Sequence, residues 1–578
     1  MNSIRDTIFI REKLGAVKLY RSNLLKILWA IQDEYRHIPQ RFIRYLCDRT
    51  ELTPEAIHSV VSFYHFFSLE HRGDITIYLD TSITSEMTGA AEVRKAFEDE
   101  LGIKVGEVTS DMQFGLFETS CMGLSDQGPA ALINHRPATF LTAKKVSDVI
   151  KLYKSGSKLP RFPKANILKS GPIFFQEIKA KKLLKKLFTY DPVDVVELVK
   201  QSGLKGRGGA GFPAGIKWEF CRNYEGPRYL FANGDEGEPG TFKDRALLMK
   251  SAKSLFLGMI IAGYALGAMR GYLYLRAEYF YMLESLEEVL TKLRRKGLLG
   301  QQILGSNFSY EISIKFGAGA YICGAETALI ESAEGKRGEP RNRPPFPAQN
   351  GYLGKPTAVN NLETLCNLPV LIDKGLDWYM QFGTQESTGT KLISVAGDCD
   401  KPGVYEFEHG VSVQDILNIA GAKNTRAVQI SGPAGTLIAS NEFDRKICFE
   451  DLPCGGAFTI FNDDRVILEI IKNHANFFME ESCGFCVPCR AGTVLINELL
   501  DKTLAGKGVA KDLEQLNEIA NIVNIASRCG LGRTAGNPII QSLEKFRDSY
   551  DKRVSQELEF ISEFDLEESL RKAREGIS

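Results

Sequence analysis

The sequence predicts a multidomain α/β protein, and three observations indicate this fold class. The chain has 578 residues, enough for roughly four domains at about 150 residues per domain. Strand-like and helix-like periodicity alternate through much of it, as in sheets that are covered by helices. A segment rich in Pro, Gly, Ser and Lys, KSGSKLPRFPK (154–164), is a linker by composition and separates a smaller N-terminal part from a larger C-terminal part.

Charge and composition exclude several classes of protein. The 72 Lys and Arg residues balance 72 Asp and Glu residues, and 44% of the chain is hydrophobic while 25% is charged. This is the composition of an ordinary folded protein rather than of a disordered or collagenous chain. The zero net charge and the lack of a long basic run argue against a partner made of nucleic acid.

The N-terminal part is expected to hold two units. Apolar residues recur at helical spacing from the capping residue Ser22 to Tyr35, and Thr53 followed by Pro54 begins another helix. Residues 1–72 are therefore expected to form a helical bundle. Residues 73–155 predict a compact α/β unit, whose expected elements are strands within 74–80, 113–119 and 129–134 and a helix within 88–102.

The C-terminal part divides into three expected units. In residues 165–385, a strand (271–276), a long helix (283–299) and a second strand (310–316) follow one another, which predicts a parallel strand pair. Residues 390–461 show short strands and turns around one helix (413–420), which indicates a small β-grasp-like insert. Residues 466–578 have helical periodicity and end in DLEESLRKAREGIS, which we expect to be a solvated helix; a helix that faces a partner is the alternative.

No segment of the sequence is expected to enter a membrane. The longest apolar run, Leu255 to Met269, is shorter than the ~20 residues that a spanning helix needs and predicts a buried helix instead. Charged residues interrupt MNSIRDTIFIREK, where a signal peptide would have its apolar core. We therefore expect a cytoplasmic protein, in which cysteines stay reduced.

Four of the twelve cysteines predict a metal centre. Cys483, Cys486 and Cys489 follow a C-x2-C-x2-C spacing, and Cys529 supplies a fourth thiolate. This spacing favours a [4Fe-4S] cluster, whereas structural zinc sites usually pair two separate C-x2-C turns; zinc is the alternative. The remaining cysteines are scattered and are expected to fill cores: Cys47, Cys121, Cys221, Cys323, Cys366, Cys399, Cys448 and Cys454.

Glycine-rich loops indicate a nucleotide-like ligand. Gly206 to Gly211 satisfies G-x-G-x-x-G, in which backbone amides approach a phosphate, but the preceding residues 193–203 have helical rather than strand periodicity. A structural turn is the alternative for this loop alone. The strand at 228–232 leads into NGDEGEPG (233–240), whose carboxylates and amide could bind a ribityl chain, a ribose or a flavin edge.

Two more loops carry polar groups after expected strands. GAGAYICGAE (317–326) passes from a strand into a helix and offers backbone amides to a phosphate. Asn360, Asn361 and Thr364 supply paired amides and a hydroxyl, although a capped turn that begins a helix explains them equally well.

Taken together, these motifs resemble a known family. GRGGAGFPAGIKW, NGDEGEPGTFKDR, GAGAYICGAETALIESAEG, RPPFPAQNGYLGKPTAVNNLETL and ESCGFCVPCRAGT are similar to the FMN-bearing, NADH-oxidising subunit of respiratory complex I, from roughly Leu183 to Tyr550. The preceding EYRHIP, SFYHFF and CMGLSDQGPA resemble its small thioredoxin-like partner, here fused at the N-terminus. Such a fusion is similar to the diaphorase subunits of bacterial NAD-reducing hydrogenases.

The resemblance implies a Rossmann-like domain that binds FMN and NAD, with site residues in several loops. For FMN it implies Gly206, Arg207, Gly208, Lys217, Asn233, Asp235, Glu236, Tyr321, Gly324, Glu326, Asn360, Asn361 and Thr364. For NAD it implies that Phe212, Phe220 and Phe346 stack on the adenine, while Glu238 lies near the ribose. A carboxylate there would repel a 2'-phosphate and so favour NAD over NADP.

The sequence departs from the family pattern in two places. Ala325 stands before Glu326 where the family usually has two glutamates, so the flavin site has one carboxylate fewer. In the thioredoxin-like region, the positions of the family's [2Fe-2S] ligands are Asp80, Ser85, Cys121 and Ser125. One thiolate cannot hold that cluster, so we expect this domain to serve structure or docking.

The resulting functional hypothesis is an electron-transfer oxidoreductase subunit. It would exchange hydride between NAD(H) and FMN and single electrons between FMN and the [4Fe-4S] cluster, and it would pass them to an iron–sulfur subunit and hydrogenase subunits. The alternatives are the flavin subunit of an NAD-dependent formate dehydrogenase or of complex I and, from another class, a docking scaffold without catalytic activity.

Overall fold

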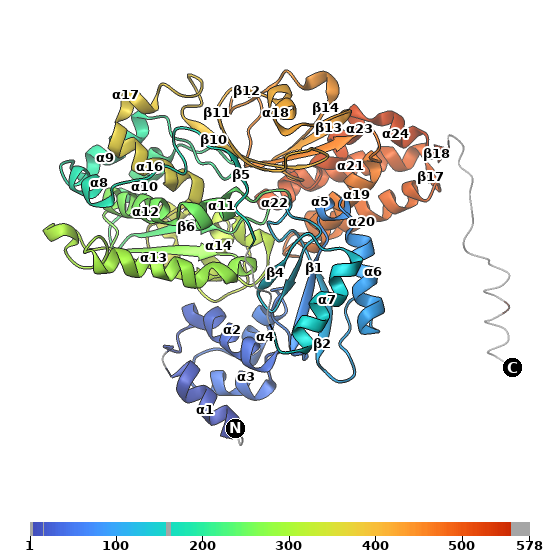
Figure 1. Cartoon of the computed structure of the whole chain (residues 1–578), viewed down its shortest axis with the longest axis horizontal. Helices are drawn as coiled ribbons and strands as arrows, with labels where there is room; N and C mark the ends of the chain where they lie inside the picture. The colour runs from blue at the N-terminus through green and yellow to red at the C-terminus, as the bar shows by residue number, and fades with distance from the viewer. Residues whose placement is uncertain (1–3, 16, 158–162, 556–570, 572–578) are drawn as a thin grey trace.

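The computed structural model describes residues 4–15, 17–157, 163–555 and 571. Four groups of elements follow one another along the chain, and they pack against each other around shared cores (Figure 1). The helices near the N-terminus lie beside the thioredoxin-like region at the bottom of the view, and the C-terminal helices lie at the upper right.

The N-terminal residues form helices and then a small mixed sheet. Three helices, α2 (Leu24–Tyr35), α3 (Gln40–Cys47) and α4 (Pro54–Val61), follow the short α1 (Ile4–Phe9). The sheet has the order β2-β1-β3-β4, in which β1 and β2 are parallel. Its strands are β1 (Ile75–Asp80), β2 (Phe114–Thr119), β3 (Ala131–Ile133) and β4 (Arg136–Ala138), and α6 (Ala90–Leu101) and α7 (Ala143–Lys154) pack on each other beside it.

A four-stranded parallel sheet with the order β8-β7-β6-β9 forms the centre of the next region. Its strands are β6 (Tyr229–Gly234), β7 (Arg270–Leu275), β8 (Glu311–Phe316) and β9 (Thr357–Asn361). Leu230 and Leu273 belong to the core that contains α12 (Ala252–Leu266) and α16 (Leu362–Lys374), whereas Phe231 and Tyr272 belong to the core shared with the N-terminal helices. Because alternate side chains point to opposite faces, both faces of this sheet are buried.

A six-stranded sheet with the order β14-β13-β16-β10-β11-β5 follows. Its strands are β10 (Thr390–Gly397), β11 (Gly403–Glu408), β13 (Thr425–Ile430), β14 (Thr436–Ala439), β16 (Ala457–Asn462) and, from before the parallel sheet, β5 (Ile167–Lys169). The helix α18 (Val413–Ala420) contributes to the core of this sheet. The edge strand β5 ties the segment after the expected linker to this sheet, because it pairs with β11.

The C-terminal region is mostly helical. Its helices are α19 (Ile467–Glu480), α20 (Val487–Leu504), α21 (Ala510–Ala526), α22 (Gly530–Thr534), α23 (Asn537–Lys545) and α24 (Arg547–Asp551), and the short strands β17 (Gly508–Val509) and β18 (Val554–Ser555) pair. The predicted helix in the final residues, DLEESLRKAREGIS, lies outside the described residues, apart from Arg571.

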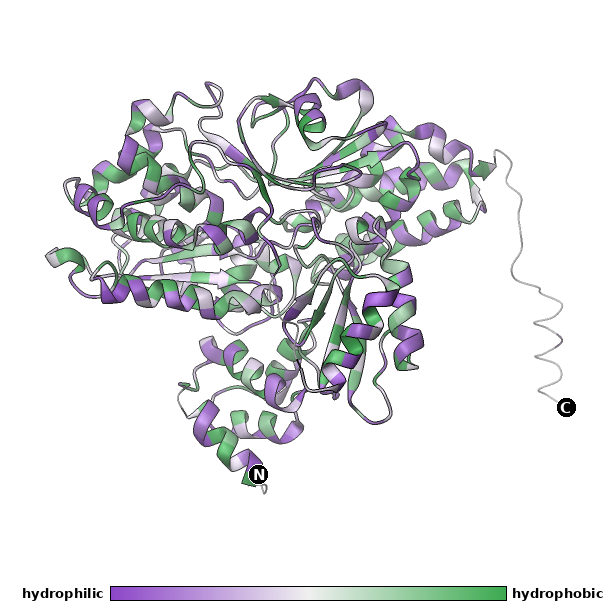
Figure 2. Cartoon of the chain, in the orientation of Figure 1, coloured by the Kyte–Doolittle hydropathy of each residue, from purple (hydrophilic) through white to green (hydrophobic). Residues whose placement is uncertain are grey.

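Most expected elements are confirmed. The parallel pair around α13 (Leu283–Arg295) is present, and residues 193–203 fall in the helix α9 (Pro192–Gln201). Thr53 caps α4 as expected, since its Oγ1 accepts from the amide of Ala56 at 3.3 Å, whereas Ser22 lies within a short 3-10 turn and does not cap α2. Figure 2 shows mainly hydrophobic residues on the strands and hydrophilic residues on the outer helix α13.

The apolar run near residue 260 is a buried helix, as predicted. All residues of α12 from Leu255 to Gly263 are buried. Within the described residues, no single helix is long and apolar enough to cross a membrane; one bent pair, α11 (Lys243–Lys250) with α12, meets the criterion only when joined.

Candidate functional site

The polar loops that the sequence singled out meet at one edge of the parallel sheet. The strands β6, β8 and β9 end at Gly234, Phe316 and Asn361 and lead directly into the loops 233–240, 317–325 and 360–364. The carboxyl ends of parallel strands lie at the same edge, where α/β sheets bind their ligands. The side chain of Asn233 joins two of the loops, because its Nδ2 donates to the carbonyl of Gly324 at 2.8 Å.

The glycine-rich loop is held against β9. The amide of Arg207 donates to Oγ1 of Thr364 at 2.9 Å, and a Cβ at Gly208 would lie only 3.2 Å from the Cβ of Asn361. Glycine at 208 is therefore suited to this close approach. The guanidinium of Arg207 is buried and donates to the carbonyl of Thr388 at 2.7 Å, so this residue presents its backbone, not its side chain, to the loop.

The helix α10 (Ala214–Arg222) is fixed to β9 by two side chains. Nζ of Lys217 forms an ion pair with Glu326 at 3.0 Å and donates to the carbonyl of Val359 at 3.0 Å. Nε1 of Trp218 donates to Oδ1 of Asn360 at 3.0 Å. Lys217 and Glu326 remain partly exposed, whereas Asn360 is buried and already paired.

The carboxylates of the NGDEGEPG loop have different surroundings. Glu236 is buried and accepts from the amide of Asp244 at 2.7 Å, from the amide of Arg245 at 3.0 Å and from the Tyr279 hydroxyl at 2.7 Å. Asp235 is half-buried, and no hydrogen bond to its carboxylate is recorded within the described residues. Its desolvation raises the pKa of Asp235 well above the ordinary value. Asp235 is thus the carboxylate of this loop that is open to a ligand.

Glu238 already has two protein partners. Its carboxylate accepts from the amide of Ala434, in the β13–β14 connection, at 3.0 Å and from the hydroxyl of Tyr321. Burial raises the pKa of Glu238 to about 7, although both hydrogen bonds lower it. Glu238, which the resemblance places near the ribose, is therefore a half-buried carboxylate that also joins the loops of Tyr321 and Ala434.

Tyr321 and Glu481 connect the edge of the sheet to the cysteine loop. The ring of Tyr321 packs edge-on against Phe477 with the ring centroids 4.8 Å apart, and its amide donates to Glu481 at 2.8 Å. Glu481 is buried and also accepts from the hydroxyl of Ser120 at 2.6 Å. Contacts of this kind depend on the fold, so no sequence signal points to Glu481 beyond its place near Cys483.

Three aromatic rings remain exposed near the glycine-rich loop. Phe212 is 45%, Phe220 49% and Phe346 56% exposed, and in the part of the chain that the structure describes no two of these rings stack on each other. Phe220 lies on α10, which contacts α15 (Pro347–Asn350), the helix that Phe346 precedes. Large apolar side chains that remain exposed close together are typical of a binding site, and flat rings suit a nucleotide base.

A buried ion network under the site was not foreseen from the sequence. Nζ of Lys243 lies 2.8 Å from Asp244 and 2.9 Å from Glu363, and Lys391 also pairs with Glu363. Nδ2 of Asn361 donates to Asp244 at 2.7 Å, while its Oδ1 caps α16 by accepting from the amide of Glu363 at 2.9 Å. The capping interpretation of Asn361 is therefore correct, and the network fixes its side chain.

The four predicted ligand cysteines lie around the starts of two helices: Cys486 and Cys529 are the N-cap residues of α20 and α22, and all four cysteines belong to or pack against one core. Cys489 and Cys529 are buried, and Cys483 and Cys486 are half-buried. Burial raises the pKa of Cys489 to about 11. Thiolates are the donors that iron–sulfur clusters require, so the residues present fit a cluster. Within the described residues, no group of three or more His, Cys, Asp and Glu is placed to hold a single metal ion.

The corresponding positions of the thioredoxin-like region carry one thiol. Cys121 lies 3.6 Å from the Ser125 hydroxyl, and Asp80 accepts from the amides of Ser82 at 2.8 Å and Met122 at 3.2 Å. The hydroxyl of Ser85 is buried, with no hydrogen-bond partner within the described residues. Hard oxygen donors at three of four positions do not fit a [2Fe-2S] cluster.

The loop around Cys121 is instead packed against the rest of the protein. Arg276 donates to the carbonyl of Cys121 at 2.6 Å, and Arg245 forms an ion pair with Asp126 at 2.6 Å in which both side chains are fully buried. Together with the contact between Ser120 and Glu481, these bonds place this loop between the edge of the sheet and the cysteine loop.

Comparison with known families and structures agrees with this arrangement. Three family models match: the Nuo51 FMN-binding domain over residues 199–370, the thioredoxin-like [2Fe-2S] ferredoxin over 10–154, and the NADH-ubiquinone oxidoreductase-F iron–sulfur binding region over 469–553. A crystal structure of an NAD+-reducing [NiFe]-hydrogenase in the H2-reduced state is similar with a TM-score of 0.89 and 37% identity, and the match covers 97% of each chain.

Two curated relatives show the extent of the similarity. The subunit HndC of the NADP-reducing hydrogenase from Solidesulfovibrio fructosivorans is 43% identical over 383 residues, which cover 64% of this chain and 78% of the relative. The alpha subunit of the NAD-reducing hydrogenase HoxS from Cupriavidus necator is 46% identical over 572 residues, which cover 95% of both chains. The chain therefore belongs to the family of the alpha subunit of NAD-reducing hydrogenase, an NADH-oxidising oxidoreductase subunit with an FMN-binding domain and a [4Fe-4S] domain.

Proposed function

We propose that this chain performs the diaphorase reaction of a soluble NAD-reducing hydrogenase at the carboxyl edge of the parallel sheet. The observation that carries this proposal is the convergence of the glycine-rich loop, the Asp235 loop and the Tyr321 loop beside three exposed aromatic rings. The first two loops suit a bound FMN, and the rings suit the adenine of NAD(H).

Residues of four segments would hold the flavin. The backbone of Gly206 to Gly208, the Lys217–Glu326 pair and the open carboxylate of Asp235 would bind its ring and ribityl chain, while Gly324 and the segment 360–364 lie where the phosphate would be bound. Bound FMN supplies the exchange between two-electron hydride transfer and one-electron transfer. The task of the protein is to orient the nicotinamide against it, and hydride transfer requires no protein acid or base.

The nucleotide would lie against Phe212, Phe220 and Phe346. Their exposed rings offer flat surfaces to a base, and Glu238 would lie close enough to the ribose to disfavour a 2'-phosphate by charge repulsion. Glu238 would perform this role while it holds Tyr321 and the β13–β14 connection in place.

Electrons would leave through the cysteine loop. Cys483, Cys486, Cys489 and Cys529 would bind a [4Fe-4S] cluster, which Glu481 and Tyr321 join to the flavin edge through direct contacts. Phe485 and Val487, which are 55% and 61% exposed, flank Cys486 and would form part of the contact with an iron–sulfur subunit. The similarity to hydrogenase subunits supports partners of that kind.

The thioredoxin-like region would serve docking rather than electron transfer. With one thiol among Asp80, Ser85, Cys121 and Ser125, it would hold no cluster. The domain bounds that we propose are 1–72 for a helical bundle, 73–155 for the thioredoxin-like domain, 165–385 for a Rossmann-like FMN and NAD domain, 390–461 for a β-grasp-like domain and 466–578 for the helical cluster domain. Twelve free thiols suit the reducing cytoplasm.

Spectra, metal content and kinetics of the purified full chain test this proposal. We expect flavin absorption, iron without zinc, and NADH oxidation with ferricyanide as acceptor. Phe220→Ala should raise KM for NADH about tenfold while FMN content stays unchanged, since an aromatic stack contributes about 0.5–1.5 kcal/mol. Tyr224→Ala, which removes a similarly exposed ring just after α10, is the matched control. A chain that binds neither flavin nor NADH would support the docking scaffold instead.

A further inference from the structure

A lysine-rich pocket lies apart from the site described above. It has a volume of about 730 Å³ and is lined by residues of α8 (Ala180–Leu187), the start of α12 and the end of α13. None of its lining residues belongs to the flavin, nucleotide or cysteine loops. The lysines that line it are Lys179, Lys181, Lys182, Lys185, Lys253, Lys292 and Lys296.

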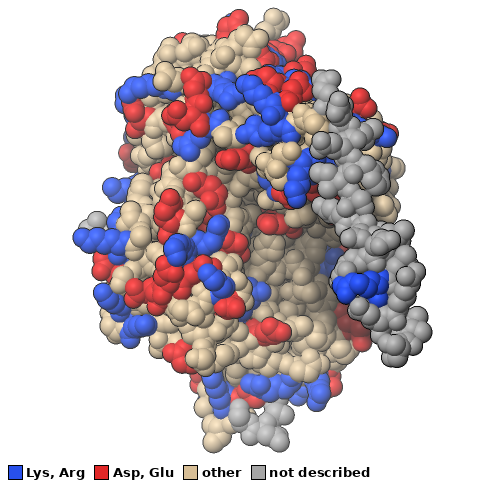
Figure 3. All heavy atoms as spheres, turned by 90° about the vertical axis from the view of Figure 1, so that its right-hand side faces the viewer, with Lys and Arg blue, Asp and Glu red and all other residues tan. Residues whose placement is uncertain are grey.

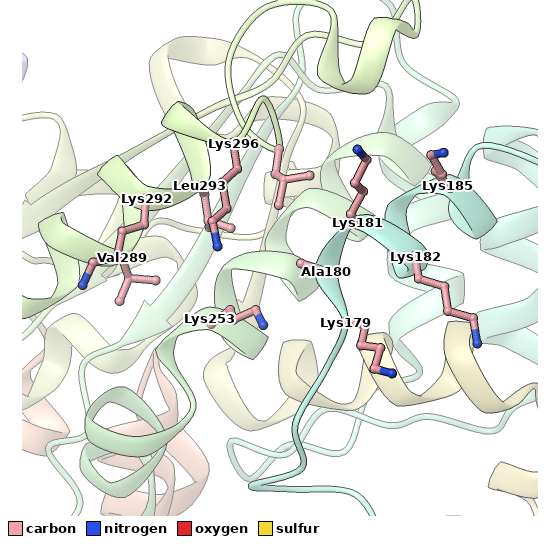
Figure 4. A pocket seen from close by; sticks show the side chains of 11 residues that line it. Lys179, Ala180, Lys181, Lys182, Lys185, Lys253, Val289, Lys292, Leu293 and Lys296 are labelled. Carbon is pink, nitrogen blue, oxygen red and sulfur yellow. The ribbon is translucent and has the colours of Figure 1, made fainter.

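The lysines are attached on two sides of the pocket. Figure 4 shows those of α8 on one side and Lys253, Lys292 and Lys296 on the other. Within the described residues, only Lys292 among the seven has a carboxylate partner, Glu288 at 3.2 Å, and that pair is exposed to solvent. Elsewhere the charges are mixed: the face in Figure 3 intersperses acidic with basic side chains. The pocket therefore concentrates positive charge that the protein itself does not neutralise.

The position of α8 makes this charge costly to the folded protein. Lys179, Lys181 and Lys182 lie at or just after the start of the helix, which has no acidic residue in its first turn. The N-terminus of a helix carries partial positive charge, so cations there are unfavourable and anions favourable. These lysines are exposed to solvent, and three others lie across a concave space from them.

Part of the pocket lining is apolar. Val289, Leu293 and Leu298 line the pocket near the lysines of α13, and Ala180 lines it on the side of α8. A volume of about 730 Å³ lies within the usual range of small-molecule sites, in which apolar walls hold the body of the ligand and a few polar groups fix its orientation. Inorganic phosphate would use only the lysines, whereas a ligand with a flat base and several phosphates would use both features.

We propose that this pocket binds a nucleoside polyphosphate, with the phosphates on the lysines of α8 and α13 and the base on Val289, Leu293 and Leu298. The pocket is separate from the proposed NAD(H) site and does not depend on the function proposed for that site. Its phosphates would neutralise the positive charge at the start of α8, so binding would stabilise the protein as well as occupy the pocket.

Calorimetric titration of the full chain with ATP tests this proposal, with NAD+ at saturation so that the adenine part of the NAD(H) site is blocked. We expect ATP to bind, with an affinity that falls as salt increases, and to bind more tightly than inorganic triphosphate or AMP. Lys181→Gln combined with Lys182→Gln and Lys296→Gln should weaken ATP binding at least about tenfold. Oxidation of NADH with ferricyanide should remain unchanged in this variant.

A matched control removes three exposed lysines elsewhere. Lys144→Gln with Lys507→Gln and Lys511→Gln changes the net charge equally and should leave ATP binding unchanged. Thermal unfolding gives a second measurement: ATP should raise the melting temperature of the wild type but not of the pocket variant, and the pocket variant without ligand should melt no lower than the wild type. Equal ATP binding by wild type and pocket variant, or no binding at low salt, would overturn the proposal; triphosphate binding as tight as that of ATP would overturn the assignment of a nucleoside.

Discussion

The cysteine loop and the thioredoxin-like region differ in the number of thiols that could bind an iron–sulfur cluster. The first has four thiols that influence one another, with two of them accessible from the surface. The second keeps its sheet and its loop, but one thiol lies among oxygen donors, and the loop is buried against Arg245, Arg276 and Glu481. A domain can thus lose the residues for its chemistry while its packing holds it in place, because the two depend on different side chains.

The largest effect should come from the cysteines. Cys486→Ala should abolish the [4Fe-4S] signal and electron delivery to partner subunits, because the substitution removes one of four ligands. FMN should stay bound, because Cys486 is far from the flavin loops in sequence. Iron analysis and electron paramagnetic resonance measure this change. The wild type should contain about four irons per chain, the content of a single [4Fe-4S] cluster.

Cys121→Ser is the control for that variant, since it removes a buried thiol from the other region. It should leave the iron content unchanged. Two additional irons per chain, with a [2Fe-2S] signal that disappears in Cys121→Ser, would show that the thioredoxin-like region binds a cluster after all. Zinc without iron would contradict the assignment of a [4Fe-4S] cluster to the cysteine loop.

The next largest effect concerns the packing of the thioredoxin-like region against the region of the parallel sheet. Arg245→Met should lower the free energy of unfolding by about 3–5 kcal/mol, because it leaves Asp126 as a buried charge without its partner. Denaturant unfolding of the full chain measures the loss. Adding Asp126→Leu should restore much of it, since the pair is then replaced by apolar side chains; a double variant as unstable as the single one would show that the pair itself is needed.

A smaller effect is expected at Glu481, which contacts both regions. Glu481→Gln keeps the shape but removes the negative charge, so the bonds with Ser120 and Tyr321 become weaker neutral hydrogen bonds, at a cost of about 1–2 kcal/mol. Unfolding experiments measure this cost, and Glu480→Gln on the neighbouring residue is the control. If both variants were equally stable, the contact between the regions would not depend on Glu481.

The smallest expected effects test two roles of Glu238: its contribution to stability and its influence on coenzyme preference. Because the folded protein raises the pKa of Glu238 from 4.5 to about 7, the folded state binds the proton more tightly than the unfolded state. Stability should therefore fall as the pH rises from about 4.5 to 7, and Glu238→Gln should remove this part of the pH dependence.

Coenzyme preference at the same residue should follow its charge. The ratio of kcat/KM for NADH over NADPH should decrease, by less than about tenfold, as the pH falls below 7 and the carboxylate is protonated. In Glu238→Gln the ratio should be low and insensitive to this group. A ratio that is the same in both proteins at high pH would leave Glu238 with its structural bonds alone.

Much of the fold could be predicted from periodicity and spacing, because these signals are local. The helices and strands around residues 271–316 and the capping of α4 by Thr53 depend on neighbouring residues in the chain. The loops of the site were also visible, since glycines and carboxylates stand out after apolar strands. The resemblance to a family added their roles, which remain proposals for the individual site residues.

The other features of the fold and of the site could not be predicted from the sequence, because they depend on contacts between residues that are far apart in the chain. Nothing local to Arg207 indicates that its guanidinium is buried toward Thr388 while its amide holds the glycine-rich loop. The same is true of the pair between Asp126 and Arg245, whose residues are 119 positions apart. Pairing of β5 with β11 likewise joins residues on opposite sides of the parallel sheet region in sequence.

The contacts of the N-terminal helices also determine the order of events during synthesis. Nε1 of Trp29 donates to the carbonyl of Gly317, 288 residues later, and the hydroxyl of Tyr64 donates to Ser332. These helices leave the ribosome before their partners, which follow 288 and 268 residues later. Their apolar surface is therefore uncovered through that interval, and transiently exposed apolar surface of this kind favours aggregation of a nascent chain.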